Sequence, residues 1–341
     1  MHLLIVTPHT DRVATGNQVT ADRYASILRG LGHQVRVLPA YDRSACDGLI
    51  ALHARRSFPS IQQFASQYPH RPLIVVLTGT DLYRDIRGDP PAQRSLELAS
   101  HLVVLQRMGL AELPAHVRGK AHVIYQSAPL LRDQQDPPTT EWRVCVVAHL
   151  RPEKDPLRTA RAAARLPASS RIQVVHLGAA LTPEQAVCAE RESAANPRYT
   201  WLGEQSHAQT RALLGSSHLL AITSRMEGSS NALCEALAQP RPTPVVASKI
   251  SGLIGTLGED YPGYFPVGDT QALTERLWRA ETDSGLYEEL QAHCARVAPL
   301  LTPERERAAW EQLLTAALAP RGAIRPAAHK RSPGQTPERT G

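Results

Sequence analysis

Two kinds of hydrophobic pattern alternate along this chain: short, almost continuously apolar runs and longer amphipathic stretches. Apolar runs of this kind predict strands covered on both faces, as in a parallel sheet flanked by helices. Helical periodicity appears between the runs, for example at 17–31 and 57–67. In the first part of the chain, strands are predicted at 2–7, 34–39, 47–52, 72–77, 101–105 and 121–125.

The alternation restarts after a polar, proline-bearing segment at 129–141. Here strands are predicted at 143–150, 172–178, 199–203, 219–224 and 243–248, and helices at 156–166, 183–195, 207–214, 231–238, 270–282, 285–298 and 303–319. We therefore predict an α/β protein with two Rossmann-like parallel-sheet domains that face each other across a cleft. The expected domains are 1–128 and 142–302, joined by a linker at 129–141. The helix at 303–319 is expected to pack back towards the first domain, ahead of a disordered tail at 320–341.

Composition and charge narrow the class of protein. Hydrophobic residues make up 42% of the 341 residues, and the five cysteines form no CxxC pair. This argues against a disulfide framework or a structural zinc site and favours a reducing, cytoplasmic setting. The apolar start has no basic segment before it and predicts a buried strand, and no apolar run approaches the roughly 20 residues of a membrane span. The net charge is +6, but the basic surplus lies mostly in 321–341. We therefore expect no nucleic-acid and no membrane partner.

The segment SRMEGSSNALCEALA at 224–238 is the richest in candidate chemistry. Glu227 lies in a loop, Glu235 lies on the helix that follows, and the small residues between them form a turn. The first turn of a helix offers free N–H groups and the positive end of a dipole, which suit a phosphate, and carboxylates can accept hydrogen bonds from sugar hydroxyls. An ordinary helix start with two solvated carboxylates is the alternative reading.

A second segment, AHLRPEKDP at 148–156, places Arg151 and Lys154 in a turn between a strand and a helix. Two cations there could stabilise a diphosphate as it leaves. A solvated charged turn is again the alternative. Both segments follow strands of the same predicted sheet, so their side chains are expected at one edge.

The Arg-x-x-Lys turn followed by Glu-x7-Glu resembles the GT-B glycosyltransferases of the glycogen-synthase-like family 4. Within that family, the chain resembles the selenosugar synthases of the selenoneine pathway. The likeness rests on the segments 16–35, 52–57, 77–85, 102–106, 123–128, 149–156, 198–204 and 226–231. One departure is visible: Ser229 stands where the family pattern has glycine, in Glu-Gly-Gly-Ala-Asn.

The resemblance implies roles for the second domain as the donor domain. Arg151, Lys154 and Glu227 would be the catalytic residues, with the two cations on the donor diphosphate. Glu227 and the 228–231 turn would hold the transferred sugar, and Glu235 the ribose. The implied donor-binding set is Gly16, Asn17, Arg151, Lys154, Gly203, Glu227, Gly228, Ser229, Ser230, Asn231 and Glu235. No metal or other cofactor is expected.

The first domain would then supply the acceptor side. The implied acceptor-binding residues follow buried strands and are Thr78, Thr80, Asp81, Tyr83, Gln126 and Ser127. A helix N-cap is the alternative for Asp81, and Arg12, Arg23 or Arg84 could hold an anionic acceptor.

The implied reaction joins a UDP-sugar, with N-acetylglucosamine expected, to selenophosphate. UDP and phosphate would be released and a selenosugar formed. A transferase acting on a hydroxyl acceptor and a non-catalytic nucleotide-sugar-binding module remain the alternatives. The sequence does not indicate the oligomeric state.

Overall fold

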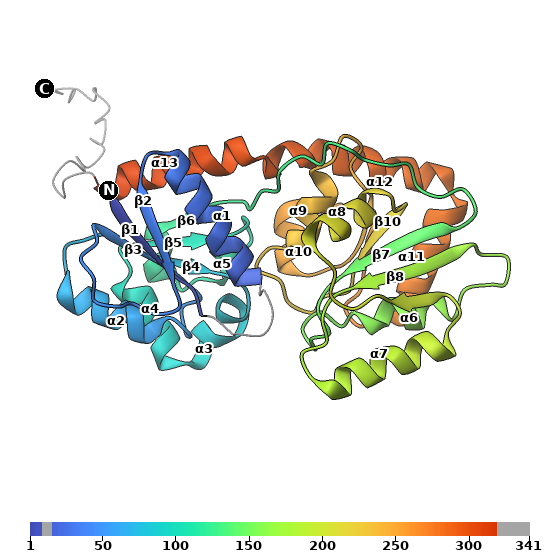
Figure 1. Cartoon of the computed structure of the whole chain (residues 1–341), viewed down its shortest axis with the longest axis horizontal. Helices are drawn as coiled ribbons and strands as arrows, with labels where there is room; N and C mark the ends of the chain where they lie inside the picture. The colour runs from blue at the N-terminus through green and yellow to red at the C-terminus, as the bar shows by residue number, and fades with distance from the viewer. Residues whose placement is uncertain (9–15, 319–341) are drawn as a thin grey trace, which may run out of the picture.

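The computed structural model describes residues 1–8 and 16–318, which form two α/β domains side by side (Figure 1). Each domain contains one six-stranded sheet. The strand order is β2-β1-β3-β4-β5-β6 in the first sheet and β12-β11-β10-β7-β8-β9 in the second. All the strand pairs are parallel. The predicted fold class, two parallel-sheet domains with interleaved helices, is therefore confirmed.

Every predicted strand is present. The strands are β1(His2–Val6), β2(Gln34–Leu38), β3(Gly48–Leu52), β4(Leu73–Leu77), β5(His101–Val104), β6(Ala121–Val123), β7(Trp142–Val147), β8(Ile172–Leu177), β9(Tyr199–Trp201), β10(Leu219–Ile222), β11(Val245–Ser248) and β12(Tyr264–Phe265). Only β12 was not predicted, because its two residues are too few to form a recognisable pattern.

The predicted helices are also present, with ends that shift by up to three residues. The helices are α1(Gly16–Gly30), α2(Phe58–Gln67), α3(Ile86–Gly88), α4(Pro90–Leu98), α5(Gly109–Glu112), α6(Leu157–Ala163), α7(Pro183–Ala195), α8(His207–Gly215), α9(Asn231–Leu237), α10(Ser251–Leu257), α11(Thr270–Thr282), α12(Ser284–Val297) and α13(Pro303–Leu318). Single π or 3-10 turns form η1(Asp81–Asp85), η2(Ala115–Lys120) and η3(Ala298–Leu301).

The first sheet is buried on both faces, which explains its continuous apolar strands. All five residues of β3 and of β4 are buried. Residues of α2 and α4 share one core cluster with the sheet, and residues of α1 and α13 share the other. Helix α13 thus returns from the second domain to complete the first (Figure 1). Its Trp310 is fully buried, with its ring 4.6 Å from that of Tyr24.

A buried polar cluster lies where the chain crosses back between the domains. The Glu306 carboxylate accepts hydrogen bonds from the amide N–H of Ser127 at 2.9 Å and from its hydroxyl at 2.5 Å. Arg23 pairs with Glu306 at 3.2 Å and reaches the side-chain oxygen of Asn231 at 3.4 Å. Burial raises the pKa of Glu306, while Arg23 opposes that shift. These bonds join α13, the segment after β6 and α1 to the beginning of α9.

No helix in the described ranges is both long enough and apolar enough to span a membrane. The tail at 320–341, for which disorder is predicted, lies outside the described residues, as does Arg12.

Candidate active site

A cavity of about 410 Å³ lies between the two domains. Loops that follow β3 and β4 line it from the first domain, and loops that follow β7, β9 and β10 line it from the second. These are the carboxyl ends of parallel strands, where open α/β sheets bind ligands. The structure brings together in this lining Gly16, Asn17, Thr78, Thr80, Gln126, Arg151, Lys154, Glu227, Gly228, Ser229, Ser230, Asn231 and Glu235.

Lys154 and Glu227 form the central ion pair of the cavity. The Lys154 ammonium lies 2.5 Å from the Glu227 carboxylate, which also accepts a 2.7 Å hydrogen bond from the Ser224 hydroxyl. Only 6% of Glu227 is exposed. The turn that carries Lys154 is fixed by Thr223, whose hydroxyl donates to the carbonyls of Lys154 and Asp155 at 3.0 and 2.8 Å. A buried carboxylate held in this way is oriented before any ligand arrives.

Arg151 lies in the same turn and makes no ion pair with any described residue. Its Nε is buried without a hydrogen-bond partner in the described part of the chain. Burial lowers the pKa of Arg151, and the charge of Arg56 lowers it further, while Glu153 and Glu227 raise it. A partly buried guanidinium with an unused donor suits an anionic ligand, which would satisfy both the charge and the donor.

The second carboxylate of the motif, Glu235, projects from α9 and is 8% exposed. One of its oxygens lies 2.9 Å from Nε2 of His207, at the start of α8. That hydrogen bond raises the pKa of His207. Ser230 caps α9 by accepting a hydrogen bond from the Leu233 amide, which fixes the entry of the chain into the helix.

The backbones of the two domains are in direct contact beside the cavity, at Gly228 of the second domain and at Thr78 and Gly79 of the first. A Cβ atom on Gly228 would lie 2.4 Å from the Thr78 carbonyl oxygen and 2.9 Å from the Gly79 nitrogen. Gly79 itself has φ +154°, in the region that favours glycine. Only a residue without a side chain fits at 228 in this arrangement. The loop after β4 and the loop before α9 are therefore in backbone contact.

Asp81 requires a correction. It follows β4 as expected, but its side chain is fully buried and does not line the cavity. One carboxylate oxygen accepts hydrogen bonds from the amides of Thr78 and Gly79 at 3.0 and 2.9 Å, and the other accepts from Ala54 at 2.9 Å. The carboxylate therefore organises the loops after β3 and β4 and has no surface to offer an acceptor.

Tyr83, Ser127 and Gly203 also lie outside the cavity lining, contrary to their predicted positions. The Tyr83 hydroxyl accepts a hydrogen bond from the Gln106 side chain at 2.8 Å, and Ser127 is bound to Glu306. Gly203 turns the chain at φ +68°, and the residues that reach the cavity are the next two, Glu204 and Gln205.

Several lining residues were not predicted, among them His53, Arg56, Glu153 and His207. His53 is buried, and its Nδ1 accepts a hydrogen bond from the Arg56 amide at 3.3 Å. Nε2 therefore carries the proton and donates to the Thr80 hydroxyl at 3.0 Å. Isolated histidines and arginines carry no spacing signal, so a single sequence could not separate His53, Arg56 and His207 from the other residues of their type. Glu153 lies inside the 148–156 segment, whose prediction rested on its two cations.

Comparison with known families decides the identity of this fold. The family model described as glycosyl transferases group 1 matches residues 127–298, just over half of the chain. The chain belongs to the group 1 glycosyltransferases. No curated protein matches it by sequence.

Several solved structures have the same fold as this chain. Anabaena HepE in complex with UDP and glucose is 15% identical, with a TM-score of 0.72, over 93% of this chain and 100% of the other. Sucrose-phosphate synthase from Thermosynechococcus elongatus is 15% identical, with a TM-score of 0.74, over 92% and 98%. A glycosyltransferase from Rickettsia africae is 13% identical, with a TM-score of 0.71, over 93% and 98%. The two-domain arrangement is thus of the GT-B type.

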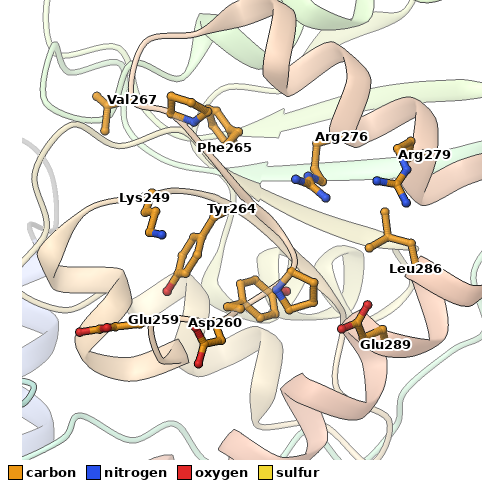
Figure 2. Close-up of a pocket in the computed structure, with 13 residues that line it drawn as sticks. Lys249, Glu259, Asp260, Tyr264, Phe265, Val267, Arg276, Arg279, Leu286 and Glu289 are labelled. Carbon is orange, nitrogen blue, oxygen red and sulfur yellow. The ribbon is translucent and has the colours of Figure 1, made fainter.

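The described part of this glycosyltransferase contains a second hollow, of about 830 Å³, at the β12 edge of the second domain (Figure 2). Arg276 and Arg279 from α11 face it, together with Lys249 and the carboxylates of Glu259 and Glu289. None of the predicted site residues lines it. We place the active site in the smaller cavity because only there do both domains and both motifs meet.

Replacing Asp81 with asparagine is expected to lower the free energy of unfolding of this glycosyltransferase by about 1–3 kcal/mol, because one of the buried acceptor oxygens becomes an NH₂ group that faces N–H donors. Urea unfolding measures the loss. Asp136→Asn is the matched control, since Asp136 is 87% exposed. Full stability combined with lost turnover in Asp81→Asn would instead assign the carboxylate a direct role in the reaction.

Proposed function

We propose that this glycosyltransferase transfers a sugar, expected to be N-acetylglucosamine, from a UDP-sugar to selenophosphate. The reaction would form a carbon–selenium bond in selenoneine biosynthesis. Selenium would attack the anomeric carbon while the bond from that carbon to the UDP oxygen breaks and UDP departs with the electron pair. Water would then attack phosphorus, the selenium–phosphorus bond would break, and phosphate and the selenosugar would be released.

On the donor side, the proposal rests on the cavity residues of the second domain. Arg151 and Lys154 would bind the diphosphate and stabilise the charge that develops on it as it leaves, in the place that a metal ion takes in other transferases. Glu227 and the amides of 228–231 would hold the sugar. Glu235 would accept hydrogen bonds from the ribose hydroxyls. The structures of HepE, which hold UDP with glucose or UDP-glucose, support a nucleotide-sugar donor for this fold.

One observation favours an anionic acceptor over a hydroxyl acceptor. Among the described residues, the first domain contributes no carboxylate to the cavity lining. Its histidine, His53, already uses both ring nitrogens, one to accept from Arg56 and one to donate to Thr80. A hydroxyl acceptor needs a base to remove its proton, whereas an anionic selenium nucleophile does not. Catalysis would then consist mainly of positioning and of leaving-group stabilisation.

The test is to follow UDP release from UDP-N-acetylglucosamine with selenophosphate and, separately, with a panel of sugar, lipid and amino-acid hydroxyl acceptors. We expect release with selenophosphate, and a product that contains selenium by mass spectrometry. Release with a hydroxyl acceptor alone would identify a conventional transferase. Tight UDP binding without turnover on any acceptor would identify a binding module.

The His207–Glu235 pair predicts a pH dependence of donor binding. Because the pKa of His207 is raised, its charged form, and with it the ion pair, is fully present below the ordinary histidine pKa and is lost as the pH rises through the raised value. We expect the affinity for UDP to fall about two- to fivefold across that rise, since His207 is largely exposed and such pairs are weak. Calorimetry over a pH series measures this fall.

The matched variant His207→Gln keeps a hydrogen-bond donor but does not titrate. The affinity of this variant for UDP should not fall as the pH rises through the raised pKa of His207. If the affinity falls as much as in the wild type, the pH dependence belongs to another group.

A further inference from the structure

Two arginines from different domains face the same cavity without a counter-ion. Arg56 follows β3 in the first domain and is exposed, and Arg151 follows β7 in the second. Neither forms an ion pair with a residue in the described ranges. Both line the same cavity. Burial is the largest cause of the lowered pKa of Arg151, and the charge of Arg56 lowers it further. Two positive charges that line one cleft favour the binding of an anion between them.

The carboxylates of the cavity do not cancel this charge. All four that the described residues provide come from the second domain, and two are already paired, Glu227 with Lys154 and Glu235 with His207. The four are Glu153, Glu204, Glu227 and Glu235. The wall that the first domain contributes therefore holds a cation and hydrogen-bond donors but no negative group.

Arg56 projects from a loop that is fixed by several buried bonds. The amide of Arg56 donates to His53, which has φ +71° and is buried. The Ser57 hydroxyl donates to the Leu52 carbonyl at 2.6 Å. Asp81 Oδ2 lies 4.0 Å from Nδ1 of His53, and Asp85 Oδ2 lies 4.0 Å from Nε2. The point from which the Arg56 side chain leaves the backbone is thus set before a ligand binds.

Thr80 lines the cavity from the same domain as Arg56 and adds a hydrogen-bond donor. Its hydroxyl oxygen accepts the Nε2 proton of His53, so the hydroxyl proton remains available to a ligand in the cavity. A guanidinium and a hydroxyl donor on one wall of a cavity suit a tetrahedral oxyanion.

We propose that Arg56 and Thr80 form an acceptor-side subsite for a phosphate-type oxyanion, separate from the position of the donor diphosphate on Arg151 and Lys154. This inference rests on the proposed function and gives the acceptor its chemical class. Two anions bound side by side repel each other, and cations from both domains offset that repulsion while the reacting atoms approach. The subsite selects a phosphorylated or inorganic oxyanion acceptor over a neutral alcohol.

The probe is inorganic phosphate, titrated by calorimetry into the full-length protein with UDP present at saturation. UDP occupies the diphosphate position, so phosphate reports on the second subsite. We expect Arg56→Met to weaken phosphate binding at least about tenfold, the size of one lost charge-assisted bond. Arg55→Met is the matched control, because Arg55 is the neighbouring residue, lies outside the cavity and pairs with Asp89 at 2.7 Å. It should bind phosphate as the wild type does.

Three results would overturn the subsite: no phosphate binding by the UDP-loaded wild type, equal phosphate binding by Arg56→Met and wild type, or loss of UDP affinity together with phosphate affinity in Arg56→Met. The last result would assign Arg56 to the donor site. Turnover with selenophosphate is measured separately. If phosphate binding depends on Arg56 but selenophosphate does not react, the subsite stands and the proposed acceptor is wrong. If Arg56→Met turns over selenophosphate as fast as the wild type does, the proposed acceptor stands and the subsite at Arg56 is wrong.

Discussion

Replacing Lys154 with methionine is expected to lower kcat by about 10²–10³-fold, the size of effect seen when one group that stabilises a developing negative charge is removed. The Lys154 ammonium is the cation bound to Glu227 at 2.5 Å, in the turn that would hold the donor diphosphate. Methionine keeps most of the length and volume of the side chain but provides no charge. It also leaves a nearly buried carboxylate without its partner, which adds to the loss.

Initial rates of UDP release, with UDP-N-acetylglucosamine and selenophosphate at saturation, measure this effect. Lys249→Met is the matched control, because Lys249 lines the separate hollow at the β12 edge of the second domain, and this substitution should leave kcat unchanged. UDP affinity, measured by calorimetry, should fall less than kcat, because the charge on the leaving group is greatest in the transition state. A kcat close to the wild-type value would exclude Lys154 from leaving-group stabilisation.

The second large effect is expected from Gly228→Ala. The added methyl group would lie 2.4 Å from the Thr78 carbonyl oxygen, so the loops of the two domains would have to separate. A displacement of about one ångström at a reacting centre can cost about 10²-fold in rate, and we expect kcat/KM to fall by about that factor. The substitution changes no charged or hydrogen-bonding side chain, so the loss would come from domain geometry alone.

Gly119→Ala provides the control, since nothing lies within 4 Å of a Cβ at Gly119. Small-angle scattering with UDP-sugar bound measures the separation of the domains and should show a more open Gly228→Ala protein. Thermal unfolding of both variants shows whether stability has changed. Wild-type kcat/KM in Gly228→Ala would mean that the contact between Thr78 and Gly228 is not part of the reacting arrangement.

The fold was readable from the sequence because its signals are local. Strands such as β3 and β4 are buried on both faces, so their apolar character is continuous along the chain. The strand β12 was missed because two residues cannot show a period. Helix α13 could be predicted as a helix, but Trp310 contacts Tyr24, which is far away in the sequence, and only the folded chain shows that contact.

That the proposed donor-side residues line one cavity could be predicted for a similar reason. Arg151 and Lys154 share one turn, and Glu227 and Glu235 share one loop-and-helix segment, so each pair is visible as a motif. Parallel topology then brings the two segments to one sheet edge. The acceptor side has no such compact motif. Position after a strand placed Asp81 at the cleft, but three backbone amides turn its carboxylate inwards.

By itself, the sequence determined the two parallel-sheet domains and indicated the motifs proposed to bind the donor, because periodicity and short spacings are properties of neighbours in the chain. Only the tertiary structure decided which residues come together across the domains: Gly228 on Thr78, Glu306 on Ser127, and Arg56 and Arg151 in one cavity lining. Such meetings depend on how two separately folded sheets dock and on where a final helix returns. That docking depends on the combined shape and burial of many side chains, so no local sequence pattern predicts it.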